Sequence, residues 1–201
     1  MISINSILDA MLKEFDEKIK PKLLRIADER IRILYLLAWL NTFLEKHGLG
    51  RIIVVRGFAV ELYTNAVIRT YDVDIDVESS HINTVREFLN IIGERIGRGY
   101  DLELVGIIRP IEIVPTTHLR DFKKIKVNNY NVYIWSPEAT LIYLVSAWKY
   151  WSSEYDMYRA KILWNTIGDK MDKEKLCKLA SEENVIEYIN KVAGEPICSH
   201  Q

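Results

Sequence analysis

The sequence has little of what would place it in a specialised class of protein. It contains only two cysteines, Cys177 and Cys198, without metal-ligand spacing, so we expect reduced thiols and no disulfide framework. The first residues do not resemble a signal peptide. The longest apolar run, 33–40, is far below the roughly 20 residues that span a bilayer. We therefore predict a cytoplasmic protein that has no membrane partner.

The sequence also lacks an excess of charge of either sign. Lys and Arg number 27 and Asp and Glu number 28, which gives a formal net charge of −1 at pH 7. No overall field would attract the chain to nucleic acid, so any basic surface must be local. Apolar residues make up 49% of the chain, enough to bury a core in one domain, or in one domain with a small appendage.

The order of apolar patterns predicts a mixed α/β fold. Helical spacing covers 4–19 and, after Pro21, 22–47, and a further helix is predicted at about 82–96. We expect a mixed sheet of about five strands between N-terminal helices and a C-terminal helical region. The predicted domains are an α/β core with the N-terminal helices at 1–135 and a helical region at 136–201.

The most informative stretch runs from Ile52 to Glu78. It predicts a buried strand at 52–55, a turn at Arg56-Gly57, a short helix at about 58–63 and a second strand with three acidic residues. Because strand side chains alternate, these carboxylates share one face of the sheet; they are Asp72, Asp74 and Asp76.

Carboxylates about 7 Å apart repel by roughly 2 kcal/mol per pair at an effective dielectric near 20. A divalent cation would offset this repulsion, and Mg²⁺ binds through few carboxylates together with substrate phosphates. The acidic strand therefore indicates a Mg²⁺ site for phosphoryl or nucleotidyl transfer. The structural alternative is a solvated face on an edge strand, where charges prevent aggregation.

The string RGFAVELYT from Arg56, followed by RTYDVDI from Arg69, resembles the signature of small prokaryotic nucleotidyltransferases of the polymerase-beta-like superfamily, including toxin–antitoxin members. The resemblance implies that Asp72 and Asp74 bind catalytic metals, with Asp76 as a spare carboxylate. It also implies that Arg56, Gly57 and Thr70 lie at the nucleotide, because Gly57 lets the backbone approach the triphosphate. Arg56 stands where the family has a first glycine.

The resemblance implies a third carboxylate from a later strand, as metal ligand or general base. Glu112, in the predicted strand 111–114, is the candidate, and Glu103, in the predicted strand 102–107, is the runner-up. Ser136-Pro137-Glu138 opens a helix as in the family. Two turns later the family has a phosphate-binding lysine, for which Lys149, about one turn further on, is the candidate substitute.

Other features point to an acceptor or to nothing beyond structure. The segment 116–131 holds a basic cluster, and aromatic residues mix with basic ones around Lys149. Both could contact RNA. The structural alternatives are a solvated face for the cluster and a helix core or dimer interface for the rings.

We therefore predict a nucleotidyltransferase that uses two Mg²⁺ ions to transfer a nucleoside monophosphate from a nucleoside triphosphate to RNA or protein. The first alternative is a catalytically degenerate nucleotidyltransferase-fold binding module or antitoxin-like partner. The second is an RNA-binding or RNA-modifying protein. A homodimer or a partner protein is compatible with each of these hypotheses.

Overall fold

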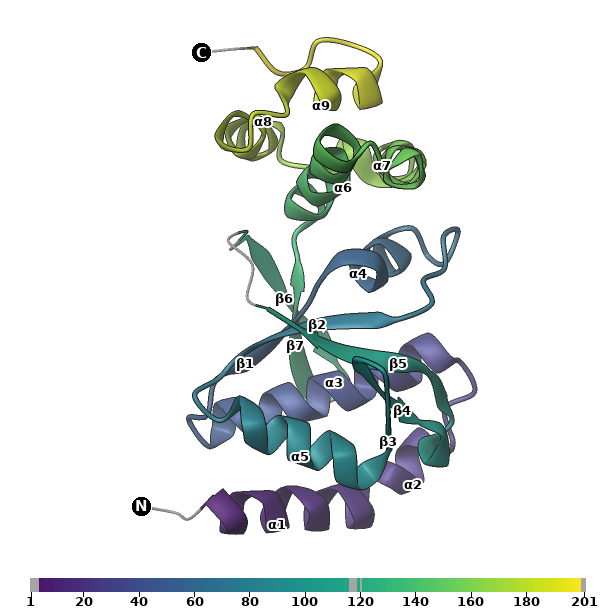
Figure 1. Cartoon of the computed structure of the whole chain (residues 1–201), viewed down its shortest axis with the longest axis vertical. Helices are drawn as coiled ribbons and strands as arrows, with labels where there is room; N and C mark the ends of the chain where they lie inside the picture. Colours follow the sequence, from purple (N-terminus) through teal and green to yellow (C-terminus); the bar gives the residue numbers. More distant parts are fainter. Residues whose placement is uncertain (1–3, 116–118, 120, 200–201) are drawn as a thin grey trace. The chain divides into compact units, whose positions relative to one another are not determined.

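The computed structural model describes residues 4–115, 119 and 121–199, and confirms a mixed α/β fold. Figure 1 shows its elements in chain order. None of the helices in these described ranges is long and apolar enough to cross a membrane. The elements are α1 (Ile4–Glu14), the π-helix η1 (Phe15–Ile19), α2 (Lys20–Leu23), α3 (Glu29–Lys46), β1 (Arg51–Val54), α4 (Arg56–Tyr63), β2 (Val73–Glu78), α5 (Ile82–Ile92), β3 (Glu94–Ile96), β4 (Gly99–Leu102), the 3-10 helix η2 (Glu103–Val105), β5 (Ile107–Val114), β6 (Phe122–Val127), β7 (Tyr130–Trp135), α6 (Pro137–Trp151), α7 (Glu154–Ile167), the 3-10 helix η3 (Gly168–Lys170), α8 (Lys173–Glu182) and α9 (Ile186–Ala193).

Contacts within the chain divide it into two compact units. The first unit comprises Met1–Val54, Tyr71–Thr117 and Lys124–Ile134, and contains most of the sheet. The second comprises Val55–Thr70, His118–Lys123 and Trp135–Gln201, and is mainly helical. Whether the predicted segments 1–135 and 136–201 fold as separate domains stays a prediction.

The sheet has the strand order β3-β4-β5-β2-β1-β7-β6. β2 pairs in parallel with β5 and antiparallel with β1, while β1 pairs in parallel with β7. Strands β1, β2 and β5 thus occupy the interior of the sheet, where both edges of each strand are hydrogen-bonded. The acidic strand β2 is therefore a central strand, and the edge-strand explanation of its charges does not apply.

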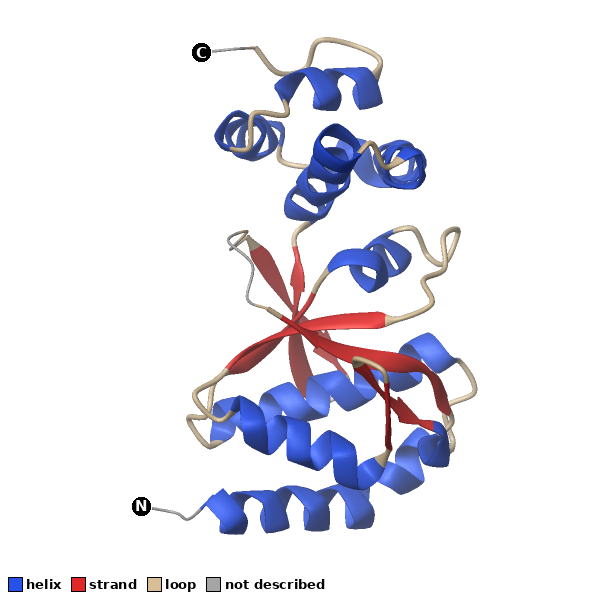
Figure 2. Ribbon diagram, in the orientation of Figure 1, coloured by secondary structure: helices blue, strands red, loops and turns tan. Residues whose placement is uncertain are grey.

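In the first unit, α3 and α5 lie on the same side of the sheet, and α1 packs on α5 (Figure 2). An aromatic cluster joins them: the ring of Trp39 on α3 lies 5.8 Å from Phe15 and 5.6 Å from Phe88 on α5, between ring centroids. All three side chains are buried. Since a buried aromatic ring removes much apolar area from water, this cluster is the centre of the first unit's core.

The N-terminal helices differ from the prediction at their junction. Pro21 was expected to separate two helices, but it lies in the first turn of α2, where its missing N–H has no intrahelical partner to lose. The break comes later, at 24–28, and Asp28 then caps α3 by accepting from the backbone N–H of Arg30 at 2.8 Å. The predicted helix 22–47 is thus α2, a loop and α3.

The segment after α5 also differs from the prediction. The predicted helix 82–96 ends at Ile92, because residues 94–96 instead form β3, which pairs with β4 across a turn at Gly97. Gly97 has φ of 60°, a conformation that glycine adopts easily and that suits a tight hairpin. The predicted strand 102–107 is mostly the 3-10 helix η2, and the predicted strand 111–114 is the second half of β5.

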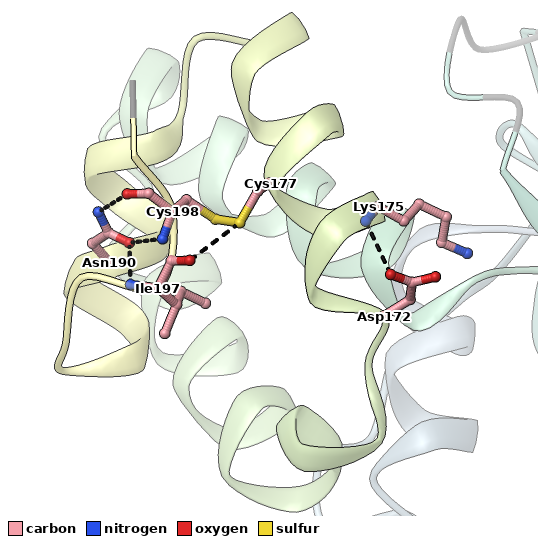
Figure 3. The surroundings of a disulfide bond; sticks show 6 residues. All are labelled: Asp172, Lys175, Cys177, Asn190, Ile197 and Cys198. Carbon is pink, nitrogen blue, oxygen red and sulfur yellow. Dashed lines mark hydrogen bonds between the residues drawn. A yellow bond between two sulfur atoms is a disulfide. The ribbon is translucent and has the colours of Figure 1, made fainter. Parts of the chain in front are cut away.

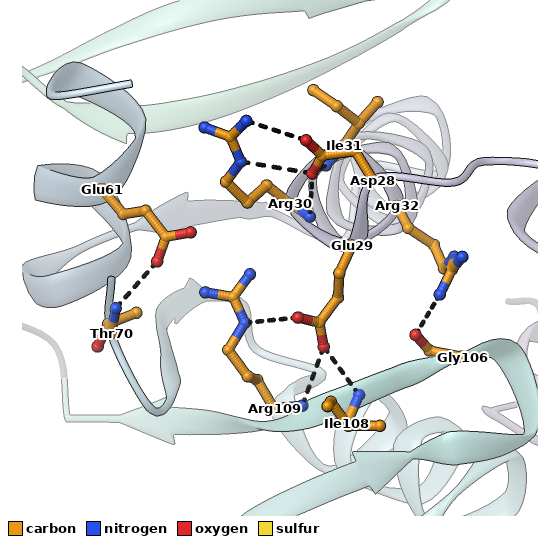
Figure 4. A network of polar contacts seen from close by, with 10 residues as sticks. All are labelled: Asp28, Glu29, Arg30, Ile31, Arg32, Glu61, Thr70, Gly106, Ile108 and Arg109. Atoms are coloured by element: carbon orange, nitrogen blue, oxygen red, sulfur yellow. Dashed lines mark hydrogen bonds and ion pairs between the residues drawn. The ribbon is translucent and has the colours of Figure 1, made fainter. Parts of the chain in front are cut away.

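Polar contacts fix the start of α3 to the start of β5 (Figure 4). Glu29 accepts from the backbone N–H groups of Ile108 and Arg109, and pairs with the Arg109 side chain at 3.0 Å. Arg32 donates to the carbonyl groups of Ile26 and Gly106. These bonds satisfy backbone groups that the loop after α2 and the turn before β5 would otherwise leave without partners.

In the second unit, α6 begins as predicted from Ser136-Pro137-Glu138. The Ser136 hydroxyl accepts from the Ala139 N–H at 3.0 Å, and Pro137 is the first helical residue. Glu138 is buried and has a structural role: it accepts from the Asp172 N–H at 2.8 Å and pairs with Lys175 at 3.1 Å. It therefore ties α6 to the start of α8.

The two cysteines form a disulfide, contrary to the prediction of reduced thiols (Figure 3). Cys177 on α8 is joined to Cys198, with 5.3 Å between their Cα atoms. Asn190 on α9 holds the same segment, because its side-chain oxygen accepts from the N–H groups of Ile197 and Cys198, each at 3.0 Å. A disulfide is typical of oxidising compartments and also of intracellular hyperthermophile proteins, so the cytoplasmic localisation stays a prediction.

Candidate functional site

The acidic residues of the predicted site lie at the start of β2. The strand begins at Val73, so Asp72 precedes it and only Asp74 and Asp76 lie on it, one residue later than predicted. Asp74 is 7% exposed and Asp76 is 2% exposed, while Val73, Ile75 and Val77 alternate with them and are also buried. Burying two carboxylates on a central strand is expensive unless they have partners or bind a cation.

Glu112 lies next to Asp74. The two residues are in register on the parallel strands β2 and β5, so their side chains project from the same face of the sheet. On the other side of Glu112, β4 places Gly99 in register with it. A Cβ at Gly99 would lie 3.2 Å from Cγ of Glu112, so the glycine leaves room for the glutamate side chain. Two carboxylates from neighbouring strands are thereby brought together.

The runner-up Glu103 is not part of this group, because it is exposed on the 3-10 helix η2 rather than on a strand. Glu78, at the other end of β2, is paired with Arg51 at 2.5 Å. In the described ranges, no group of three or more His, Cys, Asp or Glu side chains is placed to hold a metal ion. Asp74 and Glu112 form a pair of carboxylates, which fits a Mg²⁺ ion that completes its shell with water and phosphate.

The predicted nucleotide residues Arg56, Gly57, Thr70 and Lys149 belong to the second unit. Arg56 is the first residue of α4 and has φ of 53°, a left-handed conformation that favours glycine and costs other residues about 1 kcal/mol. The arginine therefore occupies a backbone position that suits the first glycine of the resembled signature.

Gly57 follows in the first turn of α4, and two side chains press against it. A Cβ at this position would lie 2.5 Å from Oγ1 of Thr70 and 3.0 Å from Nη2 of Arg159. Any residue with a side chain would therefore have to displace one of them. Thr70 is itself held by its backbone N–H, which donates to the Glu61 carboxylate at 3.0 Å (Figure 4). The structure thus brings Gly57 and Thr70 together, as the prediction required.

Lys149 is not with them. It lies in the last turn of α6, where its Nζ donates to the Asn184 carbonyl at 2.5 Å and sits 4.8 Å from the centre of the Tyr150 ring. The cation beside Gly57 is instead Arg159 on α7, which the sequence gave no reason to select. Only its wide separation in sequence from Gly57 hid it, since no local pattern links α4 to α7.

The basic segment 116–131 is only partly described, and His118 and Arg120 fall outside the described residues. Its later part is not a loop but contains β6. On that strand, Lys124 pairs with Glu45 at 3.1 Å, which is a structural use of one of the basic groups. The aromatic residues around Lys149 divide between two roles. Trp148 packs edge-on against Tyr188, whereas Tyr150, Trp151, Tyr155 and Tyr158 are exposed.

Comparisons of the chain with protein-family models, with curated proteins and with solved structures find no match.

Proposed function

We propose that this protein is a Mg²⁺-dependent nucleotidyltransferase that transfers a nucleoside monophosphate from a nucleoside triphosphate to RNA or protein. The observation that carries this proposal is the placement of Asp74 and Glu112 in register on adjacent central strands. A later strand had to supply a carboxylate beside the Asp-x-Asp strand, and Glu112 meets that requirement. The resemblance of Arg56 to Ile75 to the nucleotidyltransferase signature gives the reaction class.

Asp74 and Glu112 would hold Mg²⁺, with Asp72 as a further ligand at the start of β2. When bound, Mg²⁺ would neutralise charge on the triphosphate and favour loss of pyrophosphate. The acceptor oxygen forms a bond to the α-phosphorus as the bond to the pyrophosphate oxygen breaks. Glu112 is the candidate to take the proton from the acceptor hydroxyl, because it is half-buried and less enclosed than Asp74.

The test compares Asp74→Asn and Glu112→Gln with Glu103→Gln, which removes an exposed carboxylate from the same unit. Each full-length protein is titrated with Mg²⁺ and a nucleoside triphosphate by calorimetry, and incubated with labelled nucleotide and total cellular RNA and protein. We expect transfer by wild type and by Glu103→Gln, and a loss of at least about 100-fold in the other two. Equal transfer by all four proteins, or transfer by none, contradicts the proposal.

A binding module with the same fold is the second candidate. Its support is Lys149, which bonds to the Asn184 carbonyl and leaves the resembled lysine position without a phosphate-binding cation. In that case the wild-type protein binds triphosphate in the calorimeter but adds no label to RNA or protein, and a partner protein co-purifies with it.

A further inference from the structure

Arg159 is a buried cation that uses only part of its hydrogen-bonding capacity. It lies on α7 and is 8% exposed. Its Nη1 donates to the Asp156 carboxylate at 3.0 Å, and its guanidinium lies 5.2 Å from the centre of the Tyr155 ring. Its Nε is buried without a hydrogen-bond partner among the described residues. A buried donor without a partner costs about 1–3 kcal/mol, and more when it is charged.

The geometry of the guanidinium shows where a partner would fit. Its donors form planar edges that match two oxygens of one carboxylate or phosphate. Asp156 is bound through Nη1, which leaves the edge formed by Nε and Nη2 for a second oxyanion. Nη2 lies 3.0 Å from the point where a Cβ on Gly57 would be, so this edge adjoins the first turn of α4.

The electrostatics of that turn also favour an anion. The residue before α4 is Val55, whose side chain cannot accept a hydrogen bond, and the first turn contains no acidic residue. The N-terminus of a helix carries a partial positive charge, and anions near it are stabilised. Placing the Arg159 cation at the same position adds positive charge to positive charge. A bound anion would balance both.

We infer that the Nε and Nη2 edge of Arg159, together with the first turn of α4 at Gly57, binds a phosphate group of the nucleoside triphosphate. This rests on the proposed function and names Arg159, rather than Lys149, as the cation that holds the substrate's phosphates. Thr70 lies within reach of the same point, since its Oγ1 is 2.5 Å from the Cβ position of Gly57. Gly57 has no side chain, and the phosphate takes the space that one would fill.

The experiment uses inorganic tripolyphosphate without metal as the probe, at one fixed low salt concentration, with the full-length chain. Arg159→Lys keeps the charge but removes the planar edge, and Lys149→Gln is the matched control on α6. Calorimetry should show binding by wild type and by Lys149→Gln, and an affinity at least about tenfold lower for Arg159→Lys. Circular dichroism checks that each variant is folded.

A measurement on the wild type avoids the risk that a variant unfolds. In a protein with ¹⁵N-labelled arginine, the Nε–Hε resonance of Arg159 should move as tripolyphosphate is added. The inference is overturned if wild type does not bind, if folded Arg159→Lys binds as tightly as wild type, or if that resonance stays still while binding occurs. Arg159-dependent binding without label transfer leaves the anion site standing and removes the nucleotidyltransferase proposal. Label transfer by Arg159→Lys at the wild-type rate does the reverse.

Discussion

The two units of this protein are stabilised by different means. The first has a sheet with α3 and α5 packed on one side of it, and its largest contacts are between rings, as in the cluster of Phe15, Trp39 and Phe88. The second has short helices joined by the Glu138 to Lys175 pair and by the disulfide of Cys177 and Cys198. Apolar burial therefore dominates one unit, whereas polar and covalent links add much to the other.

The same difference applies to the candidate functional groups. The first unit presents carboxylates, Asp74 and Glu112, at the centre of a hydrogen-bonded sheet that holds them rigidly. The second presents a cation, Arg159, on a helix. Metal ligands need fixed geometry, and a strand paired on both edges supplies it. The cation can adjust to a phosphate, because a guanidinium on a flexible stem changes rotamer easily.

The sharpest way to break the first unit is Trp39→Ala. Trp39 is 1% exposed and contacts two other rings, so its loss should lower the free energy of unfolding by about 4 kcal/mol. Urea denaturation measures this change, and hydrogen exchange shows where protection falls. Trp151→Ala is the control, since that ring is 72% exposed and its loss should change stability by less than about 0.5 kcal/mol. Equal losses for both variants would contradict the comparison.

Removing the disulfide should affect the second unit. Cys177 and Cys198 are 21 residues apart, so replacing both by Ser should destabilise the protein by about 3 kcal/mol through the freedom gained by the unfolded chain. Hydrogen exchange should show lower protection in α8 and α9 and unchanged protection in α3. A reducing agent should reproduce this in wild type and have no effect on the double-serine variant. Equal loss of protection in α3 would mean that the two units unfold together.

Acid should weaken the Glu138 link in the same unit. Burial opposes ionisation of Glu138, but the N–H of Asp172 and the Lys175 side chain outweigh it and lower the pKa of the carboxyl below its ordinary 4.5. A lowered pKa in the folded state stabilises the protein above pH 4.5, and this contribution is lost as the pH falls through the folded pKa.

Glu138→Gln should therefore cost about 2 kcal/mol at pH 7 and much less at pH 3, as measured by urea denaturation at the two pH values. Glu182→Gln, on the exposed surface of α8, is the control and should change stability little at either pH. A cost for Glu138→Gln that is equal at pH 7 and pH 3 would show that the charge of the carboxylate does not stabilise α8.

Much of the fold could be predicted from local signals. The serine cap and proline at the start of α6, the turn at Asn128-Asn129 and the alternation around Asp74 all depend on residues close in sequence, and the structure has each of them. The errors came where a local signal has two meanings. Pro21 can end a helix or begin one, and Gly97 can stop a helix or make a hairpin turn. Contacts with distant strands decided between these meanings.

The candidate site divides in the same way. The spacing of Asp72, Asp74 and Asp76 predicted a shared face, and the apolar flanks of Glu112 predicted a strand, so the pair of carboxylates could be anticipated. Arg159 could not, because it is about 100 residues from Gly57 and no periodicity connects α7 to α4. The disulfide was missed for a similar reason: two cysteines give no framework pattern, and only the folding of α8 and α9 brings them together.

The sequence by itself determined the mixed α/β class, the acidic strand and the glycine turn, because each depends on the side chains and backbone preferences of neighbouring residues. Only the tertiary structure decided that Glu112 lies beside Asp74, that Arg159 rather than Lys149 lies against Gly57, and that the cysteines are joined. These pairings join residues far apart along the chain, and their positions are fixed by strand register and helix packing. Register and packing minimise the free energy of the whole fold rather than that of any one segment.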